Sequence, residues 1–374
     1  MSAKDIYELT NIKEIKEIEL NKKLVIIDKV INILQSKFKT LDKGYIKNKL
    51  YETSIFIADV PKEYFGVVYL HDTSSIYIDK SIDILKFSEE VLHEFIHAIQ
   101  TIKDNKNNTK KIGLCEFGDF KATGMGINEA AVQYITSKIS NNDLSYVNKY
   151  DVLARTYKED RYPLSCNIIM QLVYLLGEDK LINAVFNSDE NFEYEIMEKC
   201  GEGVYVSIIN GLDKMLYAEE EIVQYIDKIE NIKKSSDANS QYEEIEKEIY
   251  PYISKIDENR ALIKNTYFKT EDLILTSYFD KYFNRIENVD DVEKYREDLY
   301  NFKDLYGESE DYNGFNNYYI DKMEELEDKR LSIMRKSDNF ALSKTDNKIV
   351  NLFTKIRASL LKLLGKKYTG KQGN

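Results

Sequence analysis

Several residue types are scarce in this chain of 374 residues, which has three cysteines, three histidines, three prolines and no tryptophan. The cysteines are odd in number and have no metal-like spacing, which fits buried or free thiols in a reducing compartment. The sequence also lacks an apolar signal core near its start and any apolar run long enough to cross a bilayer. Few prolines and abundant Lys, Ile, Asn and Tyr are typical of an AT-rich bacterial genome. We therefore expect a cytoplasmic bacterial protein.

The net charge of −12 argues against a nucleic acid as the main partner. Positive charge is concentrated in residues 344–374, which carry eight Lys or Arg and one Asp, so that the remaining chain carries −19. Apolar residues recur in this tail at helical spacing, with the basic residues around them. Such a basic amphipathic helix could contact an anionic membrane surface, or it could dock on the acidic body of the protein, which we favour.

Two of the three histidines stand four residues apart in His93-Glu94-Phe95-Ile96-His97, an H-E-x-x-H pentapeptide. On a helix both imidazoles lie on one face, where they can bind a single metal ion. Glu94 follows the first histidine, so its carboxylate can reach a water on the metal and take its proton. With so few histidines, a chance match is expected on the order of twice in a thousand such chains. The motif therefore predicts a catalytic zinc site.

Residues 86–102 are expected to form the helix that carries this motif. Ser88 can cap its N-terminus, and Glu89 and Glu90 place negative charge where the helix dipole favours it. Apolar residues at helical spacing give the helix a buried face, with the two histidines on its flank. The alternative is a pair of surface histidines on an ordinary amphipathic helix, which the scarcity of histidine disfavours.

A catalytic zinc usually takes three protein ligands, so the site needs a third. Gly126 begins a helical pattern that places Glu129 in its first turn, and the small residues that follow would allow close approach to the H-E-x-x-H helix. Glu116 is the main rival for this role. Its Gly- and Phe-rich surroundings, which also contain Asp119, indicate a loop. Glu129 is therefore the better candidate ligand.

The H-E-x-x-H motif followed by Asn128-Glu129-Ala130 on a second helix resembles the thermolysin-like zinc peptidases, the gluzincins. The resemblance covers about residues 50–190 and implies a zincin-like fold, Glu129 as the third zinc ligand, and hydrolysis of a peptide or protein substrate. Two features depart from the family. Gln133 stands where the family has an Asp that orients a zinc-bound histidine, and the interval between the two motifs is longer than in thermolysin itself.

The resembled enzymes stabilise the oxyanion of the tetrahedral intermediate with a downstream histidine and a tyrosine. No histidine follows His97 in this chain, so a second donor must be Tyr, Arg or a backbone N–H. Tyr157 and Tyr162 lead this search, with Tyr157 slightly preferred. Because the chain has 29 tyrosines, either one can equally be a packing residue.

Strand and helix patterns together predict an α+β fold that is mainly α. Residues 54–60, 65–70 and 75–79 favour strands and are expected to form a small, mostly antiparallel sheet beside the H-E-x-x-H helix. His71 falls in the turn between the last two strands, where it could touch substrate but is more simply an exposed turn residue. In the resembled family an edge strand of this sheet pairs with the extended substrate. Residues 8–50 show helical spacing.

The length of the chain predicts two folded domains and a basic tail. We expect a zincin-like metallopeptidase domain in residues 1–212, a helical bundle-type domain in residues 213–343, and an amphipathic helix in residues 344–374. The second domain could form one wall of the substrate cleft, dock another protein, or simply complete the fold. Helices are expected at residues 168–177 with Gly177 as C-cap, 178–186, 192–212, 219–233, 242–264, 273–285 and 292–305, with a linker at 234–240.

These patterns support one leading hypothesis and two alternatives. The leading hypothesis is a zinc metallopeptidase in which His93, His97 and Glu129 hold Zn²⁺ and Glu94 acts as general base and then as proton shuttle to the leaving amine. The second is a zincin-like fold that retains its metal for structure or partner binding, without peptidase activity. The missing downstream histidine and Gln133 favour that alternative. The third is a hydrolase that acts on a non-peptide amide.

Overall fold

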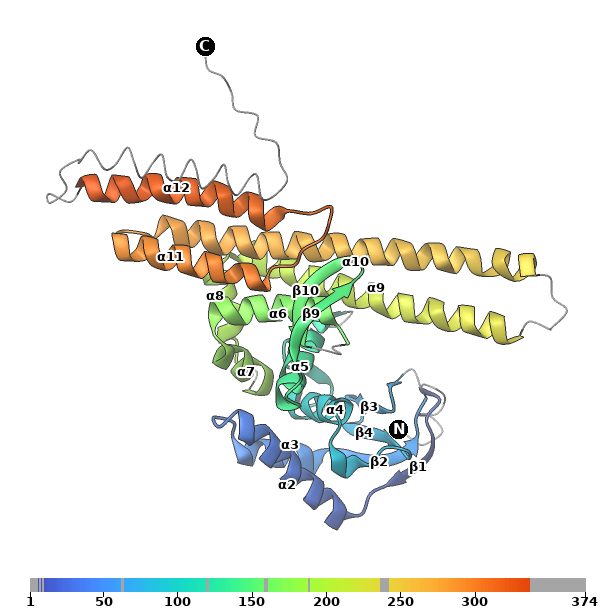
Figure 1. The fold of residues 1–374 in the computed structure, drawn as a ribbon. Helices are drawn as coiled ribbons and strands as arrows, with labels where there is room; N and C mark the ends of the chain where they lie inside the picture. Colours follow the sequence, from blue (N-terminus) through green and yellow to red (C-terminus); the bar gives the residue numbers. More distant parts are fainter. Residues whose placement is uncertain are drawn as a thin grey trace. The chain divides into compact units, whose positions relative to one another are not determined.

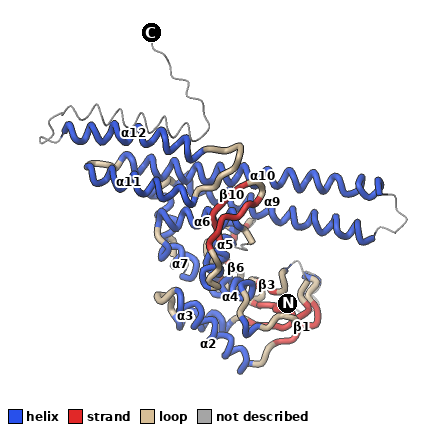
Figure 2. The backbone as a smooth tube through the Cα atoms, in the orientation of Figure 1, coloured by secondary structure: helices blue, strands red, loops and turns tan. Residues whose placement is uncertain are grey.

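The computed structural model describes residues 6, 8, 10–61, 64–118, 121–157, 161–187, 189–235 and 242–336. The chain divides into two compact units, of which the first comprises Met1–Ser277 and Asp304–Tyr312, and the second Tyr278–Lys303 and Asn313–Asn374. Helices dominate, and the strands are short and belong to the first unit (Figures 1 and 2). The expectation of a mainly helical α+β fold is therefore confirmed. The basic tail expected at residues 344–374 and residues 236–240 of the expected linker lie outside the described residues.

The N-terminal sheet has four strands in the order β1-β2-β4-β3. The β3–β4 hairpin and the β1–β2 pair are antiparallel, as expected for a mostly antiparallel sheet, whereas β2 and β4 pair in parallel. Strand β3 is therefore an edge of this sheet. Its strands are β1 (Lys13–Glu17), β2 (Ser54–Asp59), β3 (Val67–Leu70) and β4 (Ser75–Asp79).

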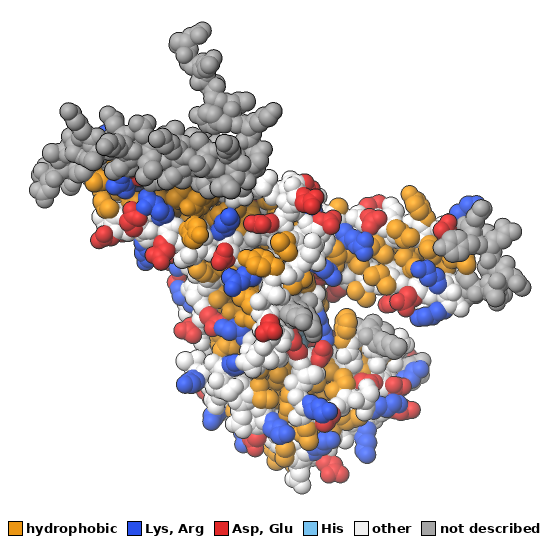
Figure 3. Space-filling view, in the orientation of Figure 1, with side chains coloured by type: hydrophobic (Ala, Val, Ile, Leu, Met, Phe, Trp, Pro, Cys, Tyr) orange, Lys and Arg blue, Asp and Glu red, His pale blue; other side chains and the backbone are white. Residues whose placement is uncertain are grey.

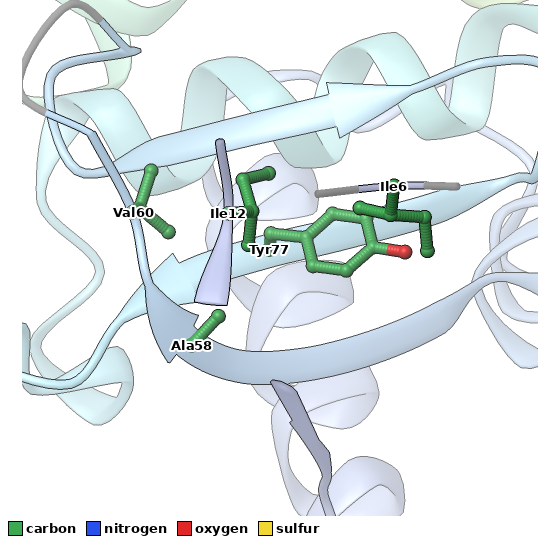
Figure 4. Close-up of a cluster of buried hydrophobic side chains, with 5 residues drawn as sticks. All are labelled: Ile6, Ile12, Ala58, Val60 and Tyr77. Atoms are coloured by element: carbon green, nitrogen blue, oxygen red, sulfur yellow. The ribbon is translucent and has the colours of Figure 1, made fainter. Parts of the chain in front are cut away.

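Strand β1 corrects one expectation, because the threefold spacing of its isoleucines predicts a helix. Glu14 has a φ of 51°, and the register of β1 against β2 shifts between Lys13 and Lys16. A bulge of this kind adds one residue to the strand, so that Ile12 and Ile15 both pack against the core of the sheet although they are three residues apart. The buried cluster drawn in Figure 4 consists of Ile6, Ile12, Ala58, Val60 and Tyr77.

The rest of the first unit is built from helices with two small antiparallel sheets between them. The helices are α2 (Leu20–Lys37), α3 (Lys43–Glu52), α4 (Glu89–Gln100), α5 (Met125–Ile139), α6 (Pro163–Leu176), α7 (Glu178–Asn187), α8 (Asn191–Lys199), α9 (Glu202–Ser235) and most of α10 (Tyr242–Asn284). The strands are β5 (Thr101–Lys103), β6 (Thr109–Ile112), β7 (Cys115–Phe117) and β8 (Ala122–Thr123) in one sheet, and β9 (Leu144–Lys149) and β10 (Val152–Tyr157) in a hairpin.

Several element boundaries differ from those that the sequence patterns predict. Helix α6 ends at Gly177 as expected, but a break at Gly201, with a φ of 124°, divides the single helix expected over residues 192–212. Residue 212, where the first domain was expected to end, lies inside α9. Helix α10 runs without interruption where two helices were expected, because the buried aromatic residues Tyr267 and Phe268 continue its apolar face.

The second unit contains the end of α10, α11 (Val289–Phe302) and α12 (Gly314–Lys336). Its core is aromatic: the rings of Phe279 and Tyr295 lie 5.7 Å apart, edge to face, and Phe302 packs on Phe279 in the same way at 5.5 Å. Over the described residues, every helix is too short or too polar to cross a membrane. Acidic and basic side chains are interspersed on the face of the protein drawn in Figure 3.

Candidate metal centre

Helix α4 presents the two histidines of the H-E-x-x-H motif. It begins after Ser88, the expected N-cap residue, and has Glu89 and Glu90 in its first turn. The side chain of Ser88 makes no capping hydrogen bond, so the acidic first turn is what favours the helix start. His93 and His97 are only 3% and 8% exposed, which rules out a pair of surface histidines.

Glu129 on α5 lies directly opposite these histidines. Its carboxylate oxygens are 3.1 Å from Nε2 of His93 and 3.2 Å from Nε2 of His97. One ligand atom from each of the three residues lies within 4.8 Å of the others, and no other such group of His, Cys, Asp and Glu occurs among the described residues. Glu129 is the fifth residue of α5, so it stands in the second turn rather than the first.

Glu116, the rival ligand, lies on strand β7 and not in a loop. It pairs with Thr123 across the sheet and is exposed, with Lys111 as its ionic partner at 3.9 Å. His71 is not part of the cluster; its Nδ1 lies 3.0 Å from Thr109 Oγ1 and 3.1 Å from Asp72 Oδ1. Asp119 lies outside the described residues.

The donor set fits a zinc ion. Two ligands of a tetrahedral zinc, each about 2.1 Å from the metal, lie roughly 3.4 Å apart, which is close to the separations between Glu129 and the two imidazoles. Two histidines and one carboxylate form a common catalytic zinc set that leaves a position open. The side chains of His93, His97 and Glu129 are also largely shielded from water, with exposed fractions of 4%, 10% and 23%. This shielding strengthens their bonds to a metal.

The three groups strongly affect each other's protonation in the absence of a metal. Burial by itself lowers the pKa of His97, but the charge of Glu129, its hydrogen bond and the charge of Glu94 raise that pKa to about 9. Burial by itself raises the pKa of Glu129, but the charge of His97 and the hydrogen bonds from both imidazoles bring it well below the usual range. The carboxylate is therefore ionised, and cationic charge is what stabilises it there.

A buried amide relay orients His97. The ring Nδ1 of His97 lies 3.1 Å from Gln100 Oε1, and the amide of Gln100 donates to Asn128 Oδ1 at 3.2 Å. Asn128 also accepts from the backbone N–H of Leu114 at 3.0 Å. Gly113 has a φ of 54°, and a Cβ at this position would collide with both amides. The relay places the Nδ1 proton of His97 toward Gln100, which leaves Nε2 free to bind a metal.

Gln133 does not have the role that its position predicts. Its amide donates to Glu89 Oε1 at 2.5 Å and to Ser137 Oγ at 3.3 Å, instead of contacting a histidine. The Nδ1 atom of His93 is buried and has no hydrogen-bond partner among the described residues. Gln133 therefore contacts Glu89 in the first turn of α4 and not the histidine that the family's Asp would orient.

Glu94 lies between the cluster and the edge strand β3. Its carboxylate accepts a hydrogen bond of 2.8 Å from the backbone N–H of Tyr69. Because Tyr69 pairs with β4 on its other side, this N–H belongs to the free edge of the sheet. Glu94 is thus fixed at the edge that an extended peptide would use for backbone pairing.

The two candidate tyrosines have different surroundings. Burial raises the pKa of the Tyr162 hydroxyl well above its usual value, and the next largest contributions come from the charges of Glu129 and Glu219. Tyr157 ends strand β10 and packs against Tyr134, with ring centroids 5.9 Å apart. The charge of Glu129, the candidate third ligand, therefore acts on the hydroxyl of Tyr162.

One residue that supports the centre has no signal in the local sequence patterns. Asp213 on α9 accepts hydrogen bonds from the backbone N–H groups of Gly124 and Gly126, at 2.9 and 2.7 Å, and so caps the helix that carries Glu129. The two glycines at the start of α5 hint at a close backbone approach, but they do not identify the partner.

Comparison of the chain with protein-family models, with curated proteins and with solved structures finds no match. The centre is therefore defined by its own residues: two histidines on one helix, a carboxylate on the next, and a glutamate at a free sheet edge. These features carry the functional argument below.

Proposed function

We propose that this chain is a zinc-dependent peptidase in which His93, His97 and Glu129 hold the metal and Glu94 is the general base. The observation that carries the proposal is the convergence of the three ligand atoms within 4.8 Å, with Glu94 beside them at the free edge of a sheet. The zincin-like architecture belongs to the same proposal. It is supported by a mixed sheet that ends in edge strand β3 next to the metal-binding helix.

A zinc ion bound by these ligands would supply positive charge that polarises the substrate carbonyl and acidifies the attacking water. The chain's own groups supply the other requirements. Glu94 receives the proton of the water and passes it to the leaving amine. The N–H of Tyr69 fixes the carboxylate of Glu94 beside the edge strand, where the backbone of an extended substrate would pair.

Tyr162 is the proposed donor to the oxyanion. Burial and the nearby carboxylates raise the pKa of its hydroxyl, so the hydroxyl keeps its proton at physiological pH and can donate it in a hydrogen bond. Tyr162 also stands at the N-cap position of α6, which fixes its backbone next to Arg161. This tyrosine takes the place of the downstream histidine that the chain lacks.

The first test is metal analysis of protein purified without added metal, combined with a peptide-library cleavage screen in the presence and absence of a chelator. We expect one zinc per chain and cleavage that is lost on chelation. Glu94→Gln should keep the metal and lower turnover by about 100- to 10,000-fold, whereas His97→Ala should lose the metal. His71→Ala is the matched control and should change neither. Full turnover by Glu94→Gln would refute the assignment.

A metal used only for structure or partner binding is the second candidate. It is favoured by the Nδ1 atom of His93, which has no hydrogen-bond partner among the described residues, since catalytic zinc ligands are normally oriented by such a partner. X-ray absorption spectroscopy of the zinc protein separates the two candidates. Four protein ligands without a water ligand would favour the structural role, and three protein ligands with an exchangeable position would favour catalysis.

A further inference from the structure

Helix α9 crosses the start of α5 in close backbone contact. A Cβ added to Gly126 would collide with the backbone carbonyl of Leu212, and the next residue, Asp213, caps α5. Glu219 and Glu220 follow these two residues by seven positions, which is two helical turns or about 10 Å. They therefore lie on the face of α9 that contacts the helix holding the third metal ligand.

Glu219 is buried without a counterion. Its side chain is only 8% exposed, and it forms no hydrogen bond or ion pair with another described residue. Burial raises its pKa to about 8, and the charge of Lys149 on β9 offsets this only in part. A carboxyl group in such a position lacks the cationic partner that would stabilise its ionised form.

Both carboxyl groups act on the metal centre. The hydroxyl of Tyr162 has a raised pKa because of burial and then because of the charges of Glu129, Glu219 and Glu220. Glu220, in contrast, is an exposed residue; partial burial of its carboxyl group raises its pKa, and the second cause is the charge of Glu129. The charges of both residues therefore act on Tyr162, the candidate oxyanion donor, and the charges of Glu220 and Glu129 act on each other.

We infer that Glu219 and Glu220 form a subsite that binds an ammonium or guanidinium group of the substrate beside the metal centre. This inference rests on the proposed peptidase function and adds a substrate class to it, namely peptides with a cationic group near the cleaved bond. Consecutive helical residues diverge by about 100° around the axis, so the two carboxylates cannot chelate one small ion but can flank a larger organic cation. Such a cation supplies both the charge and the N–H donors that Glu219 lacks.

The test uses pools of octapeptides that carry either Lys or norleucine at one fixed position, each with a free or an acetylated N-terminus. With zinc-loaded protein we expect the Lys pool to be cleaved about tenfold or more faster than the norleucine pool. If the bound cation is instead the α-ammonium group, peptides with a free N-terminus will be cleaved faster than acetylated peptides, and the Lys and norleucine pools will be cleaved equally fast. The preference should disappear in the Glu219→Gln/Glu220→Gln double variant. The charge reversal Glu220→Lys should shift it toward a third pool with Asp at the fixed position, which a merely structural residue would not do.

Glu230→Gln is the matched control, because Glu230 is exposed on the same helix about 15 Å further along, and it should keep the cation preference. Cleavage without any preference for a cation would overturn the subsite and leave the peptidase proposal standing. An absence of cleavage by the zinc-loaded protein would overturn the peptidase proposal instead. Fluorescence anisotropy with the same pools then tests the subsite alone. Tighter binding of the Lys pool than of the norleucine pool, lost in the double variant, would support the subsite. Equal binding of the two pools would refute it.

Discussion

Glu129 and Glu271 are two buried carboxyl groups of the first unit with opposite charge states. Burial raises the pKa of each, but at Glu129 the two imidazoles reverse the effect and bring the pKa well below its usual range. At Glu271 the partners are neutral, namely the backbone N–H of Gly307 at 2.9 Å, the amide of Gln171 at 3.0 Å and the hydroxyl of Tyr267, and the pKa stays well above the usual value. Neutral donors alone therefore do not keep a buried carboxylate ionised in this protein, whereas cationic partners do.

The neutral cluster has a structural role that the sequence patterns do not reveal. Gln171 and Asn167 on α6 both donate to the backbone carbonyl of Leu305, and Gly307 donates to Glu271 on α10. These bonds hold the segment of residues 304–312 within the first unit. A protonated Glu271 avoids an unpaired buried charge in this network, because its Oε1 atom, like that of Gln171, has no hydrogen-bond partner among the described residues.

Matched substitutions at the two carboxyl groups should give the largest contrast. Glu129→Gln removes the charged metal ligand, so zinc affinity should fall by more than the roughly 10- to 100-fold typical of residues that only orient a ligand. Glu271→Gln keeps the size and the neutral state of the native side chain, so it should leave zinc affinity unchanged. Competition with a chromophoric chelator measures both affinities. Equal losses in the two variants would contradict the distinction drawn between the sites.

The pH dependence of stability should separate the same two groups. Because the pKa of Glu271 is raised in the folded state, the folded protein holds this proton more tightly than the unfolded chain. The free energy of unfolding should therefore fall as pH rises above the ordinary Glu range, by up to about 1.4 kcal/mol per pH unit from this group. Glu129, whose pKa is lowered, acts in the opposite sense: its contribution in metal-free protein is present above the ordinary Glu pKa and is lost as the pH falls.

Urea unfolding of metal-free protein at pH 5, 7 and 9 tests this sign. Glu271→Gln should flatten the decline of stability between pH 5 and pH 9, and the exposed Glu310→Gln should not alter it. Glu219, with its pKa raised to about 8, adds a decline of the same sign, so the difference between wild type and variant is the quantity to compare. A slope that Glu271→Gln leaves unchanged would show that Glu271 is ionised when buried.

The three residues of the candidate metal centre could be brought together from the sequence because their relation is local. His93 and His97 share a face of α4 through helical spacing alone, and Asn128-Glu129-Ala130 is a short motif on one helix. The mainly helical class and the β3–β4 hairpin follow from equally local patterns. The β1 bulge could not be predicted from such patterns, because an extra residue in a strand mimics the spacing of a helix.

The residues that support the centre could not be predicted, because partner choice over long distances leaves no periodic signal. Gln133 occupies the position where a resembled family orients a histidine, yet its amide binds Glu89. The residue that does contact a histidine ring, Gln100, ends α4 and resembles any polar helix end. Asp213 lies 84 residues beyond Glu129 in the chain, and only the crossing of α9 over α5 brings it to the start of that helix.

The amide relay at His97 allows a third test, with a smaller expected effect. Its neutral amides orient the ring of His97 but do not balance the charge of Glu129. Gly113→Ala should displace Gln100 and Asn128, because a Cβ would collide with both amides and the backbone has a positive φ. Zinc affinity should fall by about 10- to 100-fold. Gly203→Ala is the control, because a Cβ there meets open space. Unchanged affinity in Gly113→Ala would mean that the relay does not orient His97.

Asp213 is an intermediate case, a buried carboxyl group that accepts hydrogen bonds from backbone N–H groups at the start of a helix. Its removal should have the smallest effect. Asp213→Ala leaves two N–H groups of α5 without their acceptor, which should cost about 1 kcal/mol of unfolding free energy, as for the loss of a helix cap. Because α5 carries Glu129, zinc affinity should weaken slightly and in proportion. A loss of zinc affinity as large as that of Glu129→Gln would instead mean that Asp213 itself fixes the geometry of the ligands. The centre would then depend on this helix cap as well as on the cationic partners of Glu129.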